Sequence, residues 1–295
     1  MRRSVKAAEV RRELRPGTST GLLKELHLLT RTGDLNADSL RKLRQVNHLA
    51  NLLAPVLDDV LSRFGDPVIV DCGAGKSALG FILYELFVGP AGKGRLVAVE
   101  SRPDLAQGGA ERAARLGFDR LTYLESPIAG APVPDRVHLV TALHACDTAT
   151  DDAIALAVRH GADHVAVVPC CQAEVARQLA EAGPGIAGAE VLASLHEHPW
   201  HRREFGSHLT NVLRALALEA AGYKVTVTEL AGWEHSLKNE LILGRKVRAS
   251  SPAARARLDA LLAATGVRPS VMRALEPAPG RSAATRGGAT SPSRS

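Results

Sequence analysis

The chain of 295 residues is 45% hydrophobic and 23% charged, a composition typical of one globular domain with a sizeable core. No apolar run is long enough to cross a bilayer, and the charged beginning lacks the apolar segment of a secretory signal, so we expect no membrane contact. The net charge of +6 suggests a nucleic-acid partner, but residues 1–16 and 266–295 carry +4 each and the stretch between them −2, so the basic character belongs to the ends.

The first 65 residues divide into a tail and a helical extension. Residues 1–19 are expected to form a basic, disordered tail, and residues 20–65 an extension that lies over the mouth of the site described below. Apolar residues recur at three- and four-residue steps from Leu40 to Leu61, which predicts a long helix. Asn36 and Asp38 are candidate caps at its start, and Gly65 marks its end.

Residues 66–248 alternate five times between apolar runs and helical patterns, and the runs read PVIVDCG, LVAVE, LTYLE, RVHLVTALHAC and DHVAVVPCC. The predicted helices cover Ser77–Val88, Pro103–Leu116, Thr150–His160, Gln172–Ala182 and Leu209–Ala220. KVTVTEL and LILGRKV then follow without a helical pattern between them, which predicts an antiparallel pair. We therefore predict an α/β fold with a doubly wound, mostly parallel seven-stranded sheet and an antiparallel last strand. Residues 249–265 should form a C-terminal helix, and residues 266–295 a second basic, disordered tail.

This strand plan is similar to the Rossmann-like fold of class I S-adenosylmethionine-dependent methyltransferases, whereas nucleotide-dependent dehydrogenases usually close with parallel strands. The loop after the first strand contains Asp71, Gly73 and Gly75. A phosphate-binding P-loop would need a glycine where Val70 stands, and the match of this loop to a dinucleotide-binding pattern is weak. A carboxylate directly before the glycines would repel a pyrophosphate but suits a ligand with an ammonium group, such as S-adenosyl-L-methionine.

Two further strand ends carry polar residues that suit the same ligand. Glu100 ends the second strand, where an acid accepts hydrogen bonds from the two ribose hydroxyls in either nucleotide fold. Glu125 and Ser126 end the third strand, at the usual place for contacts with the adenine edge, and we assign Ser126 to the cofactor site. The alternative is a tight turn at the glycines with a surface glutamate beside it.

Three segments, VDCGAGKSALGFILYEL, LHACDTATDDAI and VPCCQAEVARQL, together resemble a methyltransferase-domain family that includes bacterial proteins of unassigned substrate. The family is distantly similar to cysteine-rich tRNA 2′-O-methylating enzymes, and the resemblance covers about residues 22–247. It implies that Asp71, Gly73, Gly75 and Glu100 bind S-adenosyl-L-methionine. Ser77 stands in place of the last glycine of the common D-x-G-x-G-x-G form. The resemblance does not carry a substrate.

All four cysteines follow predicted strands, at the edge where ligands bind in a doubly wound sheet. They are Cys72, Cys146, Cys170 and Cys171, and they do not resemble a disulfide framework, which favours a cytoplasmic location. One interpretation is packing of small side chains, and a second is that His144 and Asp147 touch substrate or transfer a proton while Cys170 shapes the pocket. A third is zinc, but neither H-x-C nor adjacent cysteines is a usual chelating spacing, so we predict no metal.

The segment from His196 to His208 gathers histidines and arginines around two aromatic residues. We interpret it as a loop in which Trp200 and Arg203 offer a stacking surface for an RNA base or another planar substrate, with an ordinary surface loop as the alternative. Residues 233–240 could form the opposite wall or a long turn.

These observations predict an S-adenosylmethionine-dependent methyltransferase whose acceptor is open, with RNA favoured. No obligate protein partner is inferred. The alternatives are a non-catalytic binding or scaffold protein of the same fold and, less well supported, an NAD-dependent oxidoreductase.

Overall fold

The computed structural model describes residues 4–5, 17–29, 35–75, 78–143, 145–169, 172–181, 194–195, 197–230 and 240–276. The N-terminal part holds a two-stranded antiparallel pair, β1 (Ser4–Val5) and β2 (Leu35–Asn36), and the helices α2 (Thr20–Glu25) and α3 (Ala37–Arg63). Asn36, a predicted helix cap, ends β2 and directly precedes α3. Two residues of the predicted N-terminal tail pair with β2, Ser4 with Asn36 and Val5 with Leu35. No helix in the described residues is long and apolar enough to span a membrane.

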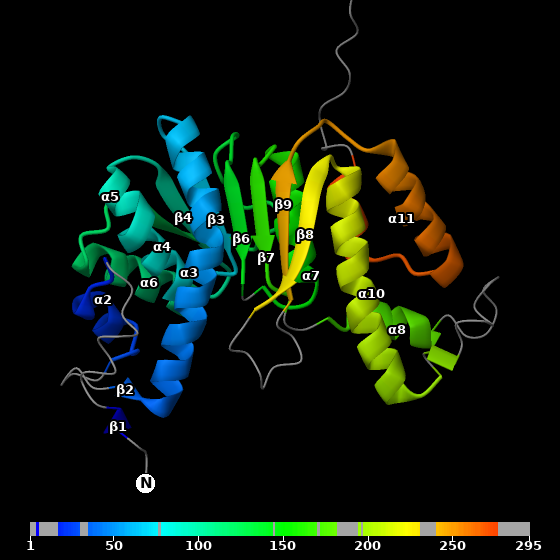
Figure 1. Ribbon diagram of the computed structural model, residues 1–295, viewed down its shortest axis with the longest axis horizontal. Coiled ribbons are helices and arrows are strands. Elements are labelled where there is room, and N and C mark those ends of the chain that lie inside the picture. The colour runs from blue at the N-terminus through cyan, green and yellow to red at the C-terminus, as the bar shows by residue number, and fades with distance from the viewer. Residues whose placement is uncertain are drawn as a thin grey trace, which may run out of the picture.

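A seven-stranded sheet forms the centre of the molecule, with the strand order β5-β4-β3-β6-β7-β9-β8 (Figure 1). Its parallel strands are β3 (Val68–Cys72), β4 (Arg95–Glu100), β5 (Leu121–Glu125), β6 (Leu139–Ala142) and β7 (His164–Val167). The last two strands, β8 (Tyr223–Glu229) and β9 (Glu240–Lys246), pair antiparallel, and β9 is also antiparallel to β7. This topology confirms the predicted doubly wound sheet with its antiparallel ending.

Helices cover both faces of the sheet because the central strands are buried on both sides. One face packs against α3, α4 (Ala78–Leu83), the π-helical turn η1 (Tyr84–Val88) and α6 (Pro103–Arg115). The short α5 (Gly89–Ala91) follows η1 and has no buried residue. The other packs against α7 (Thr148–Arg159), α8 (Glu174–Glu181), α10 (Pro199–Ala220), α11 (Pro252–Thr265) and the 3-10 helix η3 (Ser270–Leu275). Alternate strand residues serve the two cores, so Ile69 contributes to the first and Val70 to the second.

The carboxyl ends of β6 and β7 point downward in Figure 1, and α3 and α10 both begin below this edge and run upward past it. The extension contacts η1 and α6: the Ser19 amide donates to Glu85 Oε2 (2.9 Å), and Arg115 Nη2 donates to Glu25 Oε2 (3.0 Å). That the extension covers the cofactor mouth stays a prediction.

Two sequence predictions are wrong at their boundaries. The predicted C-terminal tail begins at residue 266, but residues 266–276 are folded, because Val271 and Ala274 of η3 are buried against the second core. The helix predicted for Leu209–Ala220 is α10, which starts at Pro199 rather than Leu209. Proline suits the first turn of a helix, where its missing N–H is no loss, so the His196–His208 segment is mostly helix and not loop.

Gly206 marks the closest approach of α10 to α8. A Cβ built at this position would lie 2.7 Å from both Cα and Cβ of Ala176, so the two helix backbones meet where Gly206 has no side chain. Gly108 in α6 is the opposite case, because a Cβ there meets nothing within 4 Å.

We predict that Gly206→Ala lowers the free energy of unfolding by about 1–3 kcal/mol, since overpacking forces α10 and α8 apart. Gly108→Ala is the matched control and should raise it by roughly 0.5–1 kcal/mol, the usual preference for alanine in a helix. Urea unfolding measures both. Equal effects of the two substitutions would contradict the close packing of α8 and α10.

Candidate functional site

The loop after β3 turns sharply at two glycines. Gly73 and Gly75 have φ values of +66° and +56°, a left-handed conformation that favours glycine. A Cβ at Gly73 would lie 3.2 Å from Cα of Ala145, so the glycine loop packs directly on the loop between β6 and α7. The contact with Ala145 explains the glycine at position 73, while a Cβ at Gly75 would meet only the Gly73 carbonyl oxygen at 3.8 Å and Glu100 Oε2 at 4.0 Å. That a ligand approaches this backbone stays a prediction.

Asp71 lies one residue before the end of β3 and is only 4% exposed. Its Oδ1 accepts a hydrogen bond of 2.8 Å from Oγ1 of Thr141, its register partner on β6. Thr141 was not among the predicted site residues, because only the strand pairing brings it opposite Asp71. This bond fixes the orientation of a buried carboxylate directly before the glycine loop.

Glu100 at the end of β4 connects this loop to the next strand and is 6% exposed. Its Oε2 accepts from the backbone amide of Gly75 at 2.6 Å, and its Oε1 accepts from that of Arg102 at 2.9 Å. A carboxylate has about four lone-pair sites, so both oxygens keep capacity for ligand hydroxyls. The two backbone bonds hold the carboxylate at the mouth of the glycine loop.

Ser126, just beyond β5, is half-buried, and its amide donates to the Glu100 carbonyl at 3.0 Å. Its hydroxyl donates to the Pro127 carbonyl at 2.9 Å, while Glu125 beside it is exposed. Five predicted residues thus lie together at the ends of three adjacent strands: Asp71, Gly73, Gly75, Glu100 and Ser126. Buried carboxylates beside a glycine turn fit a ligand with an ammonium group and a ribose.

Asp147, predicted to act in catalysis, has a different environment. Its backbone is strained, with φ +50° and ψ −122°, and its Oδ1 accepts from the amides of Ala173 and Glu174 at 3.0 and 3.3 Å. Its Oδ2 accepts from Nη2 of Arg177 at 3.3 Å. The carboxylate therefore binds the first turn of α8, and its catalytic role stays a prediction.

The two cysteines that the structure describes have different environments. Cys72 is buried, and burial raises the pKa of its thiol far above the usual range, so it is a packing residue without thiolate character. Cys146 is exposed. His144, Cys170, Cys171 and His196 lie outside the described residues, as do residues 231–239. Among the described residues no group of three histidine, cysteine or acidic side chains could hold a metal ion.

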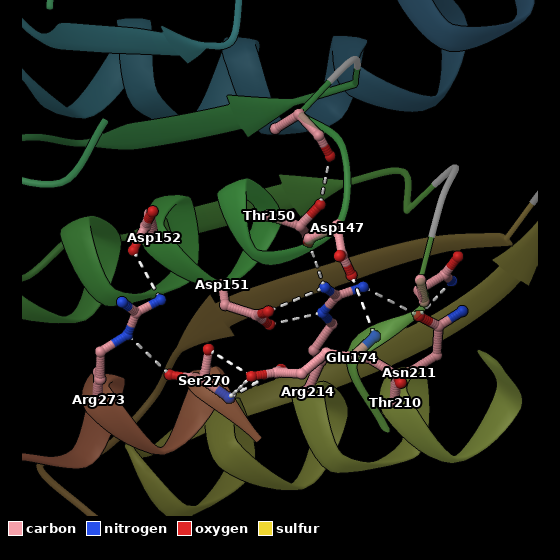
Figure 2. Close-up of polar contacts among 12 residues, drawn as sticks. Asp147, Thr150, Asp151, Asp152, Glu174, Thr210, Asn211, Arg214, Ser270 and Arg273 are labelled. Atoms are coloured by element: carbon pink, nitrogen blue, oxygen red, sulfur yellow. Dashed lines mark hydrogen bonds and ion pairs between the residues drawn. The ribbon is translucent and has the colours of Figure 1, made fainter. Parts of the chain in front are cut away.

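A buried arginine ties α10 to the loops beyond β6 (Figure 2). Arg214 is 1% exposed, and its Nε and Nη2 donate to the two carboxylate oxygens of Asp151 on α7 at 2.7 and 3.0 Å. Nη2 also donates to the carbonyl of Asp147 at 2.8 Å, and Nη1 to Oδ1 of Asn211 at 3.4 Å. Burial raises the pKa of Asp151, and the hydrogen bonds from Arg214 oppose that shift.

The sequence gives little sign of this pair, because an arginine in an amphipathic helix is expected to face solvent. The one available signal was its position between the apolar residues Leu213 and Leu216, which places it near the buried side of α10. Its partner is 63 positions away in the chain, which no local pattern indicates.

Trp200 and Arg203 lie in the first turns of α10. Trp200 is 58% exposed, and the Arg203 guanidinium carbon lies 4.2 Å from the centroid of its ring. His198 and His201 form a second pair, with ring centroids 5.5 Å apart. The sequence predicts that Trp200 and Arg203 lie on a loop. In the structure they lie three positions apart in a helix, which places both side chains on one face.

The strand order, with parallel strands and an antiparallel ending, is the one that the sequence analysis expects of a methyltransferase. Residues 41–178 match the model of a protein family described as a methyltransferase domain. The match and the strand topology confirm the predicted enzyme class, an S-adenosylmethionine-dependent methyltransferase, and its cofactor S-adenosyl-L-methionine.

Solved methyltransferase structures are similar to this chain at low identity. An rRNA methylase from Streptococcus thermophilus is 11% identical, with 67% of this chain and 95% of that chain covered and a TM-score of 0.43. The 23S rRNA methyltransferase ErmE is 13% identical (76% and 81% covered, TM-score 0.43). A geranyl diphosphate C-methyltransferase from Streptomyces coelicolor A3(2) is also 13% identical (69% and 84% covered, TM-score 0.38). No curated protein matches the chain. The identities and TM-scores of these structures do not indicate which substrate this chain methylates.

The contacts of Asp147 lead to a prediction with two variants. Asp147→Asn keeps the oxygen that accepts from Ala173 and Glu174, so we expect near wild-type stability and methyl transfer. Asp147→Ala removes the cap of α8 and should cost about 1 kcal/mol of unfolding free energy, measured by urea unfolding. A folded Asp147→Asn variant without methyl transfer would instead make the carboxylate a proton-transfer group.

Proposed function

We propose that the protein transfers the methyl group of S-adenosyl-L-methionine to an RNA acceptor. When bound, the cofactor supplies a methyl group already activated on a sulfonium, so the chain mainly has to position two reactants and exclude water. The transfer breaks the sulfonium–carbon bond, forms a bond from the acceptor atom to the methyl carbon and leaves a neutral thioether. A proton leaves the acceptor to solvent or to a nearby base.

The cofactor roles follow from the contacts around the glycine loop. The buried carboxylate of Asp71 attracts the ammonium group, and Glu100 accepts from the ribose hydroxyls with the oxygens that Gly75 and Arg102 hold in place. Gly73 and Gly75 let the ligand approach the backbone, and Ser126 borders the adenine. His144 is proposed as a candidate base, although the activated methyl group makes no base obligatory.

The observation that supports RNA is the stack of Arg203 on the exposed ring of Trp200. An exposed tryptophan with a guanidinium over one face offers the other face to a base, and the cation attracts phosphate. His198, His201 and Arg202 add polar and cationic groups on the same turns. The LHAC and PCC motifs belong to the same family resemblance. We propose that Cys170, in the second motif, shapes the pocket. A cytoplasmic location is likewise a proposal.

The competing functions have less support. A scaffold protein of this fold would bind the cofactor without turnover. An NAD-dependent oxidoreductase would place a pyrophosphate beside the buried Asp71 carboxylate, where the two negative charges repel each other.

The test is transfer of tritium from labelled S-adenosylmethionine into the RNA, protein and metabolite pools of a cell lysate. We expect label in RNA with the wild-type protein and none in any pool with Asp71→Asn, which keeps the bond from Thr141 but removes the charge. Trp200→Ala should lower transfer to RNA roughly tenfold, since stacking is worth about 1–3 kcal/mol per base.

Val247→Ala is the matched control, because Val247 is an exposed apolar residue just beyond the far end of β9. Its transfer should equal that of the wild type. Label in protein or metabolites alone would contradict the RNA acceptor, and undiminished transfer by Asp71→Asn would contradict the cofactor site.

A further inference from the structure

Among the described residues, the side-chain oxygen of Gln172 is a buried polar atom without a hydrogen-bond partner. Gln172 is 4% exposed, and its Nε2 donates to Oδ1 of Asn211 at 2.9 Å, but its Oε1 has no donor within reach in the described chain. A buried carbonyl oxygen without a donor destabilises the folded protein, so such an atom requires an explanation.

The surrounding network fixes the direction of this oxygen. Asn211 Oδ1 also accepts from Arg214 Nη1 at 3.4 Å, while Asn211 Nδ2 donates to Oε2 of Glu240 at 3.0 Å. With a cation on one side and a carboxylate on the other, the Asn211 amide has only one favourable orientation (Figure 2 shows its bond with Arg214). Its oxygen therefore faces Gln172, and Gln172 must present its NH₂ to Asn211 and its oxygen elsewhere.

The position of Gln172 follows from a chain of contacts across the carboxyl edge of the sheet. The next two residues, Ala173 and Glu174, donate their amides to Asp147 in the loop after β6. Ala145 in that same loop packs against Gly73 of the cofactor loop. Gln172 thus lies in the loop after β7, which contacts the loop after β6, and that loop in turn packs on the predicted cofactor loop.

We propose that Oε1 of Gln172 accepts a hydrogen bond from an amino or hydroxyl group of the methyl acceptor. This inference rests on the proposed function and adds a specificity determinant to it. A carbonyl oxygen can only accept a hydrogen bond. The site therefore selects methyl-acceptor substrates that can donate one and disfavours purely apolar substrates. The Arg214–Asn211 network serves this selection by holding the amide before substrate arrives.

The test compares Gln172→Met with Gln178→Met. Gln178, on α8, has both amide atoms satisfied, because its Oε1 accepts from the Arg268 amide at 2.6 Å and its Nε2 donates to the Arg268 carbonyl at 3.1 Å. The two substitutions remove the same group, and only Gln172 has the unsatisfied oxygen. Gln172→Asn is a second variant that keeps the amide but withdraws it by one methylene.

Initial rates of tritium transfer are measured against the concentration of total cellular RNA, at saturating labelled S-adenosylmethionine and per folded protein. We expect Gln172→Met and Gln172→Asn to lower kcat/KM for RNA at least tenfold while the Kd for S-adenosylmethionine, measured by calorimetry, stays that of the wild type. Gln178→Met should lower the melting temperature and leave kcat/KM unchanged.

Two results would overturn the inference and are distinguishable. Wild-type kcat/KM in both Gln172 variants removes Gln172 from the acceptor site and leaves the proposed function intact. If the wild-type protein labels no pool of the lysate, the proposed function and this inference fall together. If it labels protein or metabolites instead, the RNA acceptor is wrong, and the same comparison on the labelled pool decides Gln172.

Discussion

The buried guanidinium of Arg214 constrains the part of the molecule formed by α7, α10 and the loop after β6. Arg214 lies inside the protein, where an unpaired charge would cost several kcal/mol, and its donors are matched by Asp151, the Asp147 carbonyl and Asn211. These three hydrogen-bond acceptors come from α7, from the loop after β6 and from α10 itself. Satisfying one guanidinium therefore fixes how α10 lies against α7 and the loop after β6.

The cofactor side is built on a different principle. There the ends of three parallel strands bring Asp71, Glu100 and Ser126 to one edge, and hydrogen bonds from backbone amides and Thr141 orient the two carboxylates. The two sides meet where Ala145 packs on Gly73. A rigid contact between the loop that holds the cofactor and the loop that adjoins the acceptor suits a reaction in which a methyl group passes directly between them.

Much of this arrangement follows from local sequence patterns. Apolar runs that end in polar residues or glycine predict the strand ends, and the order of the elements predicts the sheet. The start of α10 was missed because the segment after His196 is polar and lacks apolar periodicity, while its helical state depends on Pro199 and on packing of Gly206 against Ala176. Residues 266–276 read as a tail because their few apolar side chains gain burial only in the tertiary structure, against α7 and α10. The pairing of Arg214 with Asp151, and with it the role of Gln172, depends on contacts between distant segments that no spacing rule contains.

Calorimetric titration of the wild-type protein with S-adenosylmethionine, its demethylated product and NAD tests the central claim most directly, because it asks which ligand the glycine loop and the two buried carboxylates hold. The account predicts binding of both S-adenosylmethionine and its product at one site per chain, weakened by Glu100→Gln, and no measurable binding of NAD. Tight binding of NAD without binding of S-adenosylmethionine would contradict it.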